Sequence, residues 1–167
     1  MMKKHILILL ILCSANIFSQ TYNDFIENAE FKRKSKDFKG SILDLSKAIA
    51  LNPNIPEPYF DRGAIKMVLE DYRGAMLDLN MAIDLNPNYT KAYFSRGLNK
   101  VKLKDYAGAI LDYNKVIELE PNSPEAYYFR GINKFRLGDT NGACLDWSKA
   151  GEQGYGKAYE TIKEVCN

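Results

Sequence analysis

The four strings GSILD (40–44), GAMLD (74–78), GAILD (108–112) and GACLD (142–146) follow one another at intervals of 34 residues. The same interval aligns a column of prolines and a column of aromatic residues. These are Pro53, Pro87 and Pro121, and Phe25, Tyr59, Tyr93 and Tyr127. Self-similarity at a fixed interval of this size predicts a repeat architecture, in which each copy stacks on its neighbours.

Each copy contains two helix signals. In the second copy, a helical pattern at spacings of three and four is formed by Tyr59, Arg62, Gly63, Lys66 and Met67 and continues to Leu69, and Asp71 is placed to cap a second helix. The Asn-Pro-Asn stretch at 86–88 ends that helix because proline lacks a backbone N–H. The sequence therefore predicts helical hairpins and no strands.

The 34-residue unit resembles the tetratricopeptide repeat. The resemblance is carried by the aromatic-x-x-x-Gly of Tyr59–Gly63, the Asp-Tyr pair at 71–72, Ala75, Ala82 and Pro87. It implies an all-α solenoid of four helix-turn-helix repeats, at 22–55, 56–89, 90–123 and 124–155. Residues 156–167 echo the start of a repeat, and we expect them to form a C-terminal capping helix.

The N-terminus has the layout of a secretory signal peptide. Lys3 and Lys4 precede an unbroken apolar run from Ile6 to Leu12, which is followed by small and polar residues. The run is shorter than the ~20 residues that a transmembrane helix needs. We therefore expect an exported bacterial protein, periplasmic or secreted, from which residues 1–19 are removed.

Two details of the leader stay open. Cleavage near Ala15 is an alternative to cleavage after Ser19. Lipidation of Cys13 is a second alternative. Lipoprotein signals have a small residue directly before the cysteine, however, whereas Leu12 precedes Cys13.

The composition of the remaining chain excludes several classes of function. Without Lys3 and Lys4, the 23 basic residues fall to 21 and equal the 21 acidic residues, and the single histidine, His5, is also lost. A balanced charge gives no case for nucleic-acid binding, and the lack of histidine argues against histidine catalysis and histidine–zinc sites. We expect no enzymatic activity, no cofactor and no metal, and membrane contact only through the cleaved signal peptide.

Charged residues also form columns in the repeats. The columns are Asp44, Asp78, Asp112 and Asp146, and Arg62, Arg96 and Arg130. Antiparallel helices bring residues level when they are equally far from the intervening turn. We therefore expect structural ion pairs between neighbouring repeats: Asp44–Arg62, Asp78–Arg96 and Asp112–Arg130.

The same symmetry applies to Cys144 and Cys166. They are centred on residue 155, which corresponds to Pro121 one repeat earlier. An oxidising compartment permits a disulfide between them, which would hold the capping helix. Two buried thiols are the alternative.

Tetratricopeptide proteins are interaction scaffolds whose first helices line a concave groove, and the resemblance implies such a groove here. The columns that would face it contain an apolar, aromatic-rich stripe. We expect Phe60, Phe94, Tyr128, Leu98, Ile132 and Lys91 to contact a partner. The alternative is that some of these side chains pack against neighbouring helices. Some family members bind acidic chaperone tails with a clamp of lysine, asparagine and arginine side chains. At the corresponding positions of this chain, only Lys91 fits.

The sequence thus predicts an exported adaptor that binds a protein or peptide in its groove. Two alternatives remain. The stripe could be the permanent interface of a structural subunit in an envelope assembly. The compartment and the aromatic content also allow a factor associated with the cell wall or with a polysaccharide.

Overall fold

The computed structural model describes residues 21–166. The expected signal peptide, its cleavage site and Cys13 lie outside these residues. Residues 21–34 are helical. They are followed by α2 (Phe38–Leu51), α3 (Pro56–Val68), α4 (Tyr72–Leu85), α5 (Thr90–Lys102), α6 (Tyr106–Leu119), α7 (Pro124–Arg136), α8 (Thr140–Glu152) and α9 (Gly156–Val165). Within the described part of the chain there is no strand.

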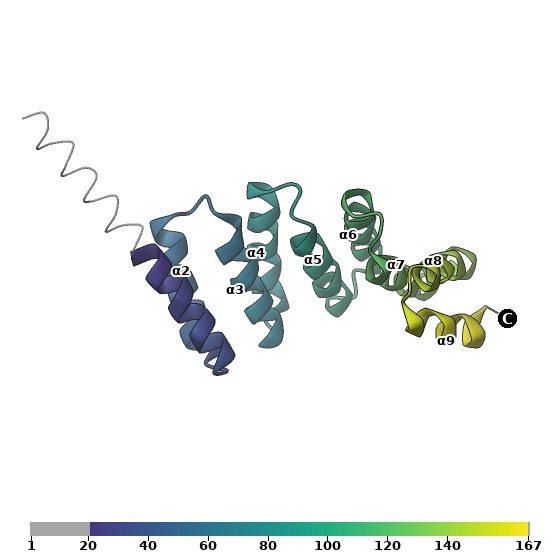
Figure 1. Cartoon of the computed structure of the whole chain (residues 1–167), viewed down its shortest axis with the longest axis horizontal. Coiled ribbons are helices and arrows are strands. Elements are labelled where there is room, and N and C mark those ends of the chain that lie inside the picture. Colours follow the sequence, from purple (N-terminus) through teal and green to yellow (C-terminus); the bar gives the residue numbers. More distant parts are fainter. Residues whose placement is uncertain (1–20, 167) are drawn as a thin grey trace, which may run out of the picture.

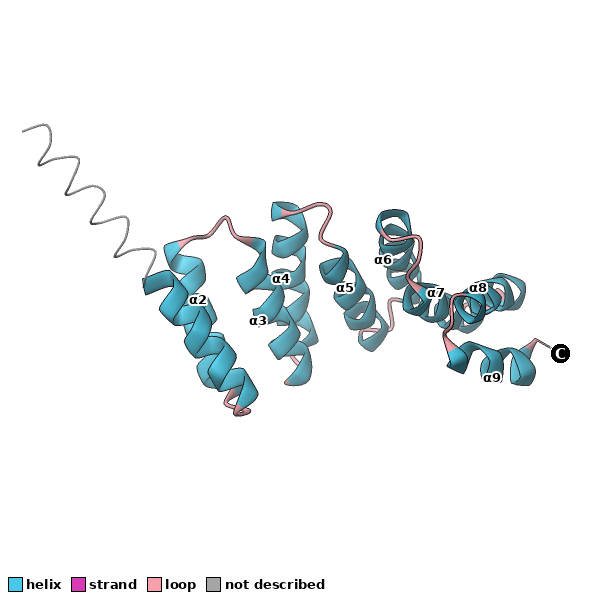
Figure 2. Ribbon diagram, in the orientation of Figure 1, coloured by secondary structure: helices cyan, strands magenta, loops and turns pink. Residues whose placement is uncertain are grey.

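The helices form an open stack in chain order, joined by short loops (Figure 2). Their axes turn along the stack, so that α2 to α4 are seen lengthwise and α8 is seen closer to end-on (Figure 1). The protein is therefore an all-α solenoid, as the repeat predicts. The helices α3, α5 and α7 begin at Pro56, Thr90 and Pro124, the first residues of the second, third and fourth sequence repeats.

An aspartate starts each second helix. The Asp71 carboxylate accepts a hydrogen bond from the Gly74 backbone N–H at 2.9 Å, which satisfies one of the free N–H groups at the start of α4. Asp37, Asp105 and Asp139 cap α2, α6 and α8 in the same way. The predicted capping role of Asp71 is confirmed.

The glycines at 63, 97 and 131 allow the two helices of a hairpin to approach closely. A Cβ atom at Gly97 would lie 2.9 Å from the Tyr113 ring, and one at Gly131 would lie 2.7 Å from Trp147 Nε1. Tyr113 and Trp147 are fully buried, as is Leu79 opposite Gly63. Because glycine has no side chain, these three positions on the first helices make room for the large core side chains of Leu79, Tyr113 and Trp147.

The glycines that open the strings GSILD, GAMLD, GAILD and GACLD recur for a different reason. A Cβ atom at Gly74 would meet the Asp71 carboxylate that caps its own helix, and Gly40, Gly108 and Gly142 have the same neighbour in their repeats. Close packing of another helix therefore does not explain these four glycines.

The expected ion pairs between repeats are also wrong. Arg62 pairs with Asp78 at 2.6 Å, Arg96 with Asp112 at 2.7 Å and Arg130 with Asp146 at 2.5 Å, each pair within one repeat. Both arrangements bring the residues level across a turn, but the aspartate faces the first helix of its own hairpin. There it is shared with a lysine one turn beyond the arginine, Lys66, Lys100 or Lys134.

The arginines do bridge neighbouring repeats, through neutral partners. Arg96 donates from Nη1 to Asn80 Oδ1 at 2.9 Å while the rest of its guanidinium holds Asp112. Arg62 and Arg130 donate in the same way to Ser46 and Asn114. Each arginine therefore joins the hairpin that carries it to the preceding one.

In the first repeat, Asn28 stands where the later repeats have Arg62, Arg96 and Arg130, and Asp44 pairs instead with Lys32 at 2.6 Å and with Lys47 at 3.3 Å. Burial alone would raise the pKa of this carboxyl, but the hydrogen bonds and charges of the two lysines outweigh it, so the pKa is lowered. Asp44 is therefore paired within its own repeat, like the other three aspartates of its column, but with lysines and not with an arginine.

The last helix closes the stack. Ala158 of α9 is fully buried, and Tyr155, Ile162 and Val165 pack on the cluster around Trp147. Cys144 and Cys166 form the expected disulfide, with their Cα atoms 5.9 Å apart. The bond ties the end of α9 to α8, where no further repeat covers the core.

Candidate functional site

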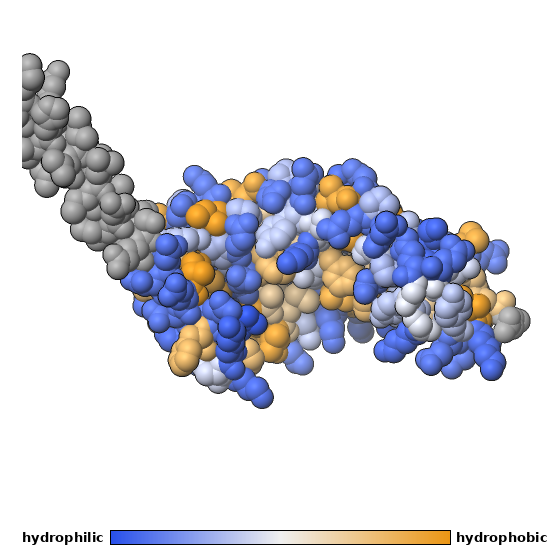
Figure 3. Space-filling view, viewed as in Figure 1, coloured by the Kyte–Doolittle hydropathy of each residue, from blue (hydrophilic) through white to orange (hydrophobic). Residues whose placement is uncertain are grey.

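Two pockets lie on the face formed by the first helices α3, α5 and α7, and we call them together the groove. The acidic pocket has a volume of about 360 Å³ and is lined by Phe60, Thr90, Lys91, Phe94, Ser95, Val116, Glu120, Ser123 and Glu125. The basic pocket has a volume of about 350 Å³ and is lined by Met67, Tyr72, Leu98, Val101, Lys102, Phe129, Ile132, Asn133 and Arg136. Apolar atoms gather at the centre of the space-filling view, over α3 to α6 (Figure 3).

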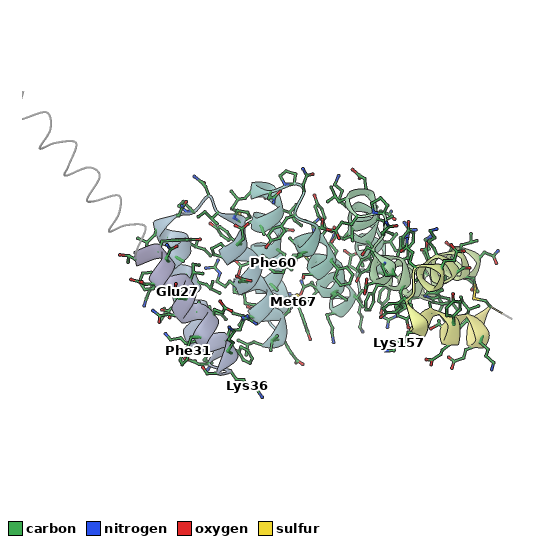
Figure 4. The ribbon with its side chains drawn as sticks, in the orientation of Figure 1. Glu27, Phe31, Lys36, Phe60, Met67 and Lys157 are labelled. Carbon is green, nitrogen blue, oxygen red and sulfur yellow. A yellow bond between two sulfur atoms is a disulfide. The ribbon has the colours of Figure 1, made fainter. Side chains whose placement is uncertain are left out.

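Aromatic rings separate the two pockets. The Phe129 ring lies 5.7 Å from the Phe94 ring, edge to face, and both rings pack against the buried Tyr113. Phe94 lines the acidic pocket and Phe129 lines the basic pocket. On α3, Phe60 and Met67 face the two pockets from positions about two helical turns apart (Figure 4).

Five of the six expected contact residues line the groove. Phe60, Phe94 and Lys91 lie in the acidic pocket, and Leu98 and Ile132 lie in the basic pocket. The apolar members of this set are half-buried, so they present part of each side chain to a ligand.

Tyr128, the sixth expected residue, lines neither pocket. Its ring lies 4.7 Å from that of Tyr155, and its hydroxyl lies 3.4 Å from Thr161 Oγ1 on α9. The capping helix packs here because it occupies the place of the next repeat's first helix. The structure therefore joins Tyr128 to the cap and leaves it outside both pockets.

The expected stripe omitted Phe129, whose ring divides the groove. The sequence carried a signal for it, because the equivalent positions in the two preceding repeats are Asp61 and Ser95. A large apolar residue in a column of small polar ones indicates a local role. Val116 and Glu120 were also missed, because they reach the groove from the end of a second helix and its C-cap.

Charges are distributed unequally along the groove. The acidic pocket has Glu120, Glu125 and Lys91 at its edge, whereas the basic pocket has Lys102 and Arg136 and no acidic residue. All five side chains are exposed, and within residues 21–166 none of them takes part in an ion pair. The structural aspartates, in contrast, are all paired.

Further carboxylates extend the acidic end. Burial raises the pKa of Tyr89 to about 12, and the charges of Asp61 and Glu57 add to this effect. The Tyr89 ring lies 5.2 Å from Phe60, a wall of the acidic pocket. Loss of hydration also raises the pKa of Asp61 itself, although its side chain remains exposed in part. Glu57 and Asp61 therefore lie beside this pocket and strengthen its negative charge.

The basic pocket contains one unsatisfied polar atom. Asn133 is fully buried, and its Nδ2 donates to the Phe129 carbonyl oxygen at 2.6 Å. Its Oδ1 has no hydrogen-bond donor in the described chain. Asn99, one repeat earlier, also has an unpaired Oδ1, but it is not among the residues that line either pocket of the groove.

Other kinds of site find no support in residues 21–166. No group of three or more histidine, cysteine or acidic side chains there is arranged to hold a metal ion. None of the described helices combines the length and apolar character that crossing a membrane requires.

Comparison with known proteins places the fold in a family. A family described as "TPR repeat" matches residues 97–138. The solved structure "First TPR of Spaghetti (RPAP3) bound to HSP90 peptide SRMEEVD" is 30% identical, with a TM-score of 0.69 over 72% of this chain and 95% of that chain. The chain is a tetratricopeptide-repeat protein.

Other tetratricopeptide structures resemble it as closely in shape. A structure of MamA is 25% identical, with a TM-score of 0.78 over 83% of this chain and 81% of that chain. YrrB, described as "a TPR protein with an unusual peptide-binding site", has a TM-score of 0.75 at 19% identity over 92% of this chain and 87% of that chain, a likeness of fold alone. No curated protein matches the sequence significantly.

Proposed function

We propose that this tetratricopeptide protein is an exported adaptor that binds a protein or peptide segment in the groove, without catalysing a reaction. The observation that carries the proposal is the pair of adjoining pockets, each of about 350 Å³, with apolar walls and unpaired charges at their edges. Concave sites with apolar walls and a few polar groups are typical of ligand binding.

Two related structures support peptide recognition on this fold. The RPAP3 repeat domain is bound to an HSP90 peptide, and YrrB has a peptide-binding site. Both likenesses concern the stacked repeats that also form the groove here. The partner of this chain need not be the same, because Lys91 is its only match to the clamp residues considered above.

The test of the groove must separate binding from folding. The Phe94 ring packs on Tyr113 and Phe129, so its truncation would lower stability as well as remove a contact. A photoreactive amino acid introduced at position 98 in the groove, or at position 111 on the outer face, avoids this problem. Leu111 is 67% exposed on the second helix α6, and it provides a matched control.

After irradiation of cells that produce the protein, we expect covalent adducts from position 98 and none from position 111. Adducts from position 111 alone would contradict the groove as the binding site. A permanent subunit interface would instead give a fixed stoichiometric complex in light scattering of the purified protein.

Export is the second part of the proposal. It is supported by the Lys-Lys and apolar pattern at residues 3–12 and by the disulfide, which an oxidising compartment would maintain. Mass spectrometry of the protein recovered from the envelope fraction should find an N-terminus near Gln20. An intact N-terminus in the cytosolic fraction would contradict export.

A further inference from the structure

The two pockets of the groove differ in charge although they are alike in size. The acidic pocket carries Glu120 and Glu125 against Lys91, and Glu57 and Asp61 lie beside it. The basic pocket carries two cations and no anion. None of the charges that line the two pockets takes part in an ion pair within residues 21–166, and the Arg136 guanidinium lies 5.0 Å over the Tyr106 ring, so a charged ligand can supply the missing ionic partner.

The distance between the pockets follows from helix geometry. Phe94 and Val101 line different pockets and are seven residues apart on α5, which corresponds to about 10 Å at a rise of 1.5 Å per residue. A peptide in the polyproline II conformation has three residues per turn and a rise of about 3.1 Å per residue, so its side chains three residues apart lie on one face about 9 Å apart. Two apolar side chains three residues apart can therefore enter both pockets.

The unpaired Asn133 oxygen adds a polar requirement at the basic end. A buried acceptor without a donor is costly, and a backbone N–H of a bound peptide would satisfy it once the side chain turns toward the pocket that it lines. Lys102 and Arg136 at the same pocket would then bind a carboxylate next to the apolar side chain.

We propose that the groove selects a charge-polarised peptide segment, with two apolar side chains flanked by a cationic residue at the acidic pocket and a carboxylate at the basic pocket. This inference rests on the proposed function, since it names the chemistry of the ligand bound in the same groove. The carboxylate can belong to an aspartate or glutamate side chain or to a peptide C-terminus.

Selection from random peptide libraries displayed on phage tests the proposal. One library has free peptide C-termini and the other has internal peptides, so the two sources of the carboxylate are distinguished. We expect peptides enriched on the purified oxidised protein to carry a basic and an acidic group on opposite sides of an apolar pair. Fluorescence anisotropy then measures the affinity of each synthetic peptide.

Charge reversal in the protein provides the decisive comparison. Arg136→Glu should weaken the enriched peptides about fivefold, and a peptide with lysine in place of its acidic residue should recover the loss. Arg73→Glu, the same change at an exposed position of α4 outside both pockets, should leave affinity unchanged. Glu125→Lys should weaken the interaction with the basic end of the peptide.

The outcomes separate this inference from the proposed function. Enriched apolar peptides without paired charges, or an affinity that Arg136→Glu does not alter, would overturn the charge polarity and leave peptide binding intact. If no peptide is enriched, or if enriched peptides crosslink outside the groove, the proposed function and this inference both fail.

Discussion

The glycine column at 63, 97 and 131 provides a graded test of the packing. Alanine in place of a helix-interior glycine gains about 1 kcal/mol of helix propensity. At Gly131 the new Cβ atom would lie 2.7 Å from Trp147 Nε1 and 3.1 Å from the Ala143 carbonyl oxygen. Such overpacking costs about 1–3 kcal/mol, and displacement of the Trp147 ring would weaken its hydrogen bond to the Tyr128 carbonyl oxygen.

Gly63→Ala is the matched control. Its new Cβ atom would lie 3.2 Å from Leu79 Cγ, 3.3 Å from Asp78 Cβ and 3.4 Å from the Ala75 carbonyl oxygen, so its neighbours need to move by only a few tenths of an ångström. We expect this variant to be as stable as the wild type or more stable by up to about 1 kcal/mol, from the same gain in helix propensity. Gly131→Ala should lose about 1–3 kcal/mol, because the gain in propensity only offsets the weakened Trp147 hydrogen bond, of about 1 kcal/mol, and leaves the cost of overpacking.

Urea unfolding of the oxidised protein measures both changes. Circular dichroism follows the helices, and fluorescence of Trp147, the only tryptophan of the chain, reports directly on the contact with Gly131. If the two variants had equal stability within about 0.5 kcal/mol, the assignment of these glycines to close helix approach would be refuted.

Three further predictions concern covalent and charged contacts. Reduction of the Cys144–Cys166 disulfide, which spans 22 residues, should lower the free energy of unfolding by about 3 kcal/mol, and titration of the denatured, non-reduced protein without residues 1–19, which include Cys13, should find no free thiol. A double-mutant cycle between Arg96 and Asp112 should give a coupling above about 1 kcal/mol, whereas a cycle between Arg96 and the aspartate of the preceding repeat should give about zero. Because the pKa of Asp61 is raised, ionisation of this carboxyl lowers stability at neutral pH, so D61N should melt higher than the wild type at about pH 7 and should lose this advantage at about pH 3.

The sequence was sufficient to predict the fold because its four repeats can be aligned with one another. Four copies at one interval fix the helices, and the Asp71 cap and the Gly97 column each have a local physical cause that is visible in the residues. The disulfide was also accessible, because Cys144 and Cys166 are symmetric about the last turn and the hairpin brings them level.

The ion pairs show where symmetry about a turn is insufficient. Asp78 is level both with Arg96 across one turn and with Arg62 across the other. Which arginine it meets depends on the direction of the side chain around the helix, and this direction is set by packing. Sequence spacing fixes position along a helix more firmly than it fixes the face.

The groove shows a second limit. The columns predicted which side chains of α3 and α5 line it, but at the C-terminal end the capping helix covers Tyr128. The division by Phe129 and the opposite charges of the two pockets depend on neighbours from three or four helices. Such neighbours become visible only when the superhelical stack is known.

The most direct test of the groove is paramagnetic broadening of methyl signals by a spin-labelled peptide from the library selection. We expect broadening of the methyl signals of Leu98 and Ile132, which line the basic pocket, and unchanged signals from Leu77, Leu111 and Leu145, which are at least 67% exposed on the second helices. Broadening of these three leucines, with sharp signals from Leu98 and Ile132, would place the ligand on the outer face and contradict the account.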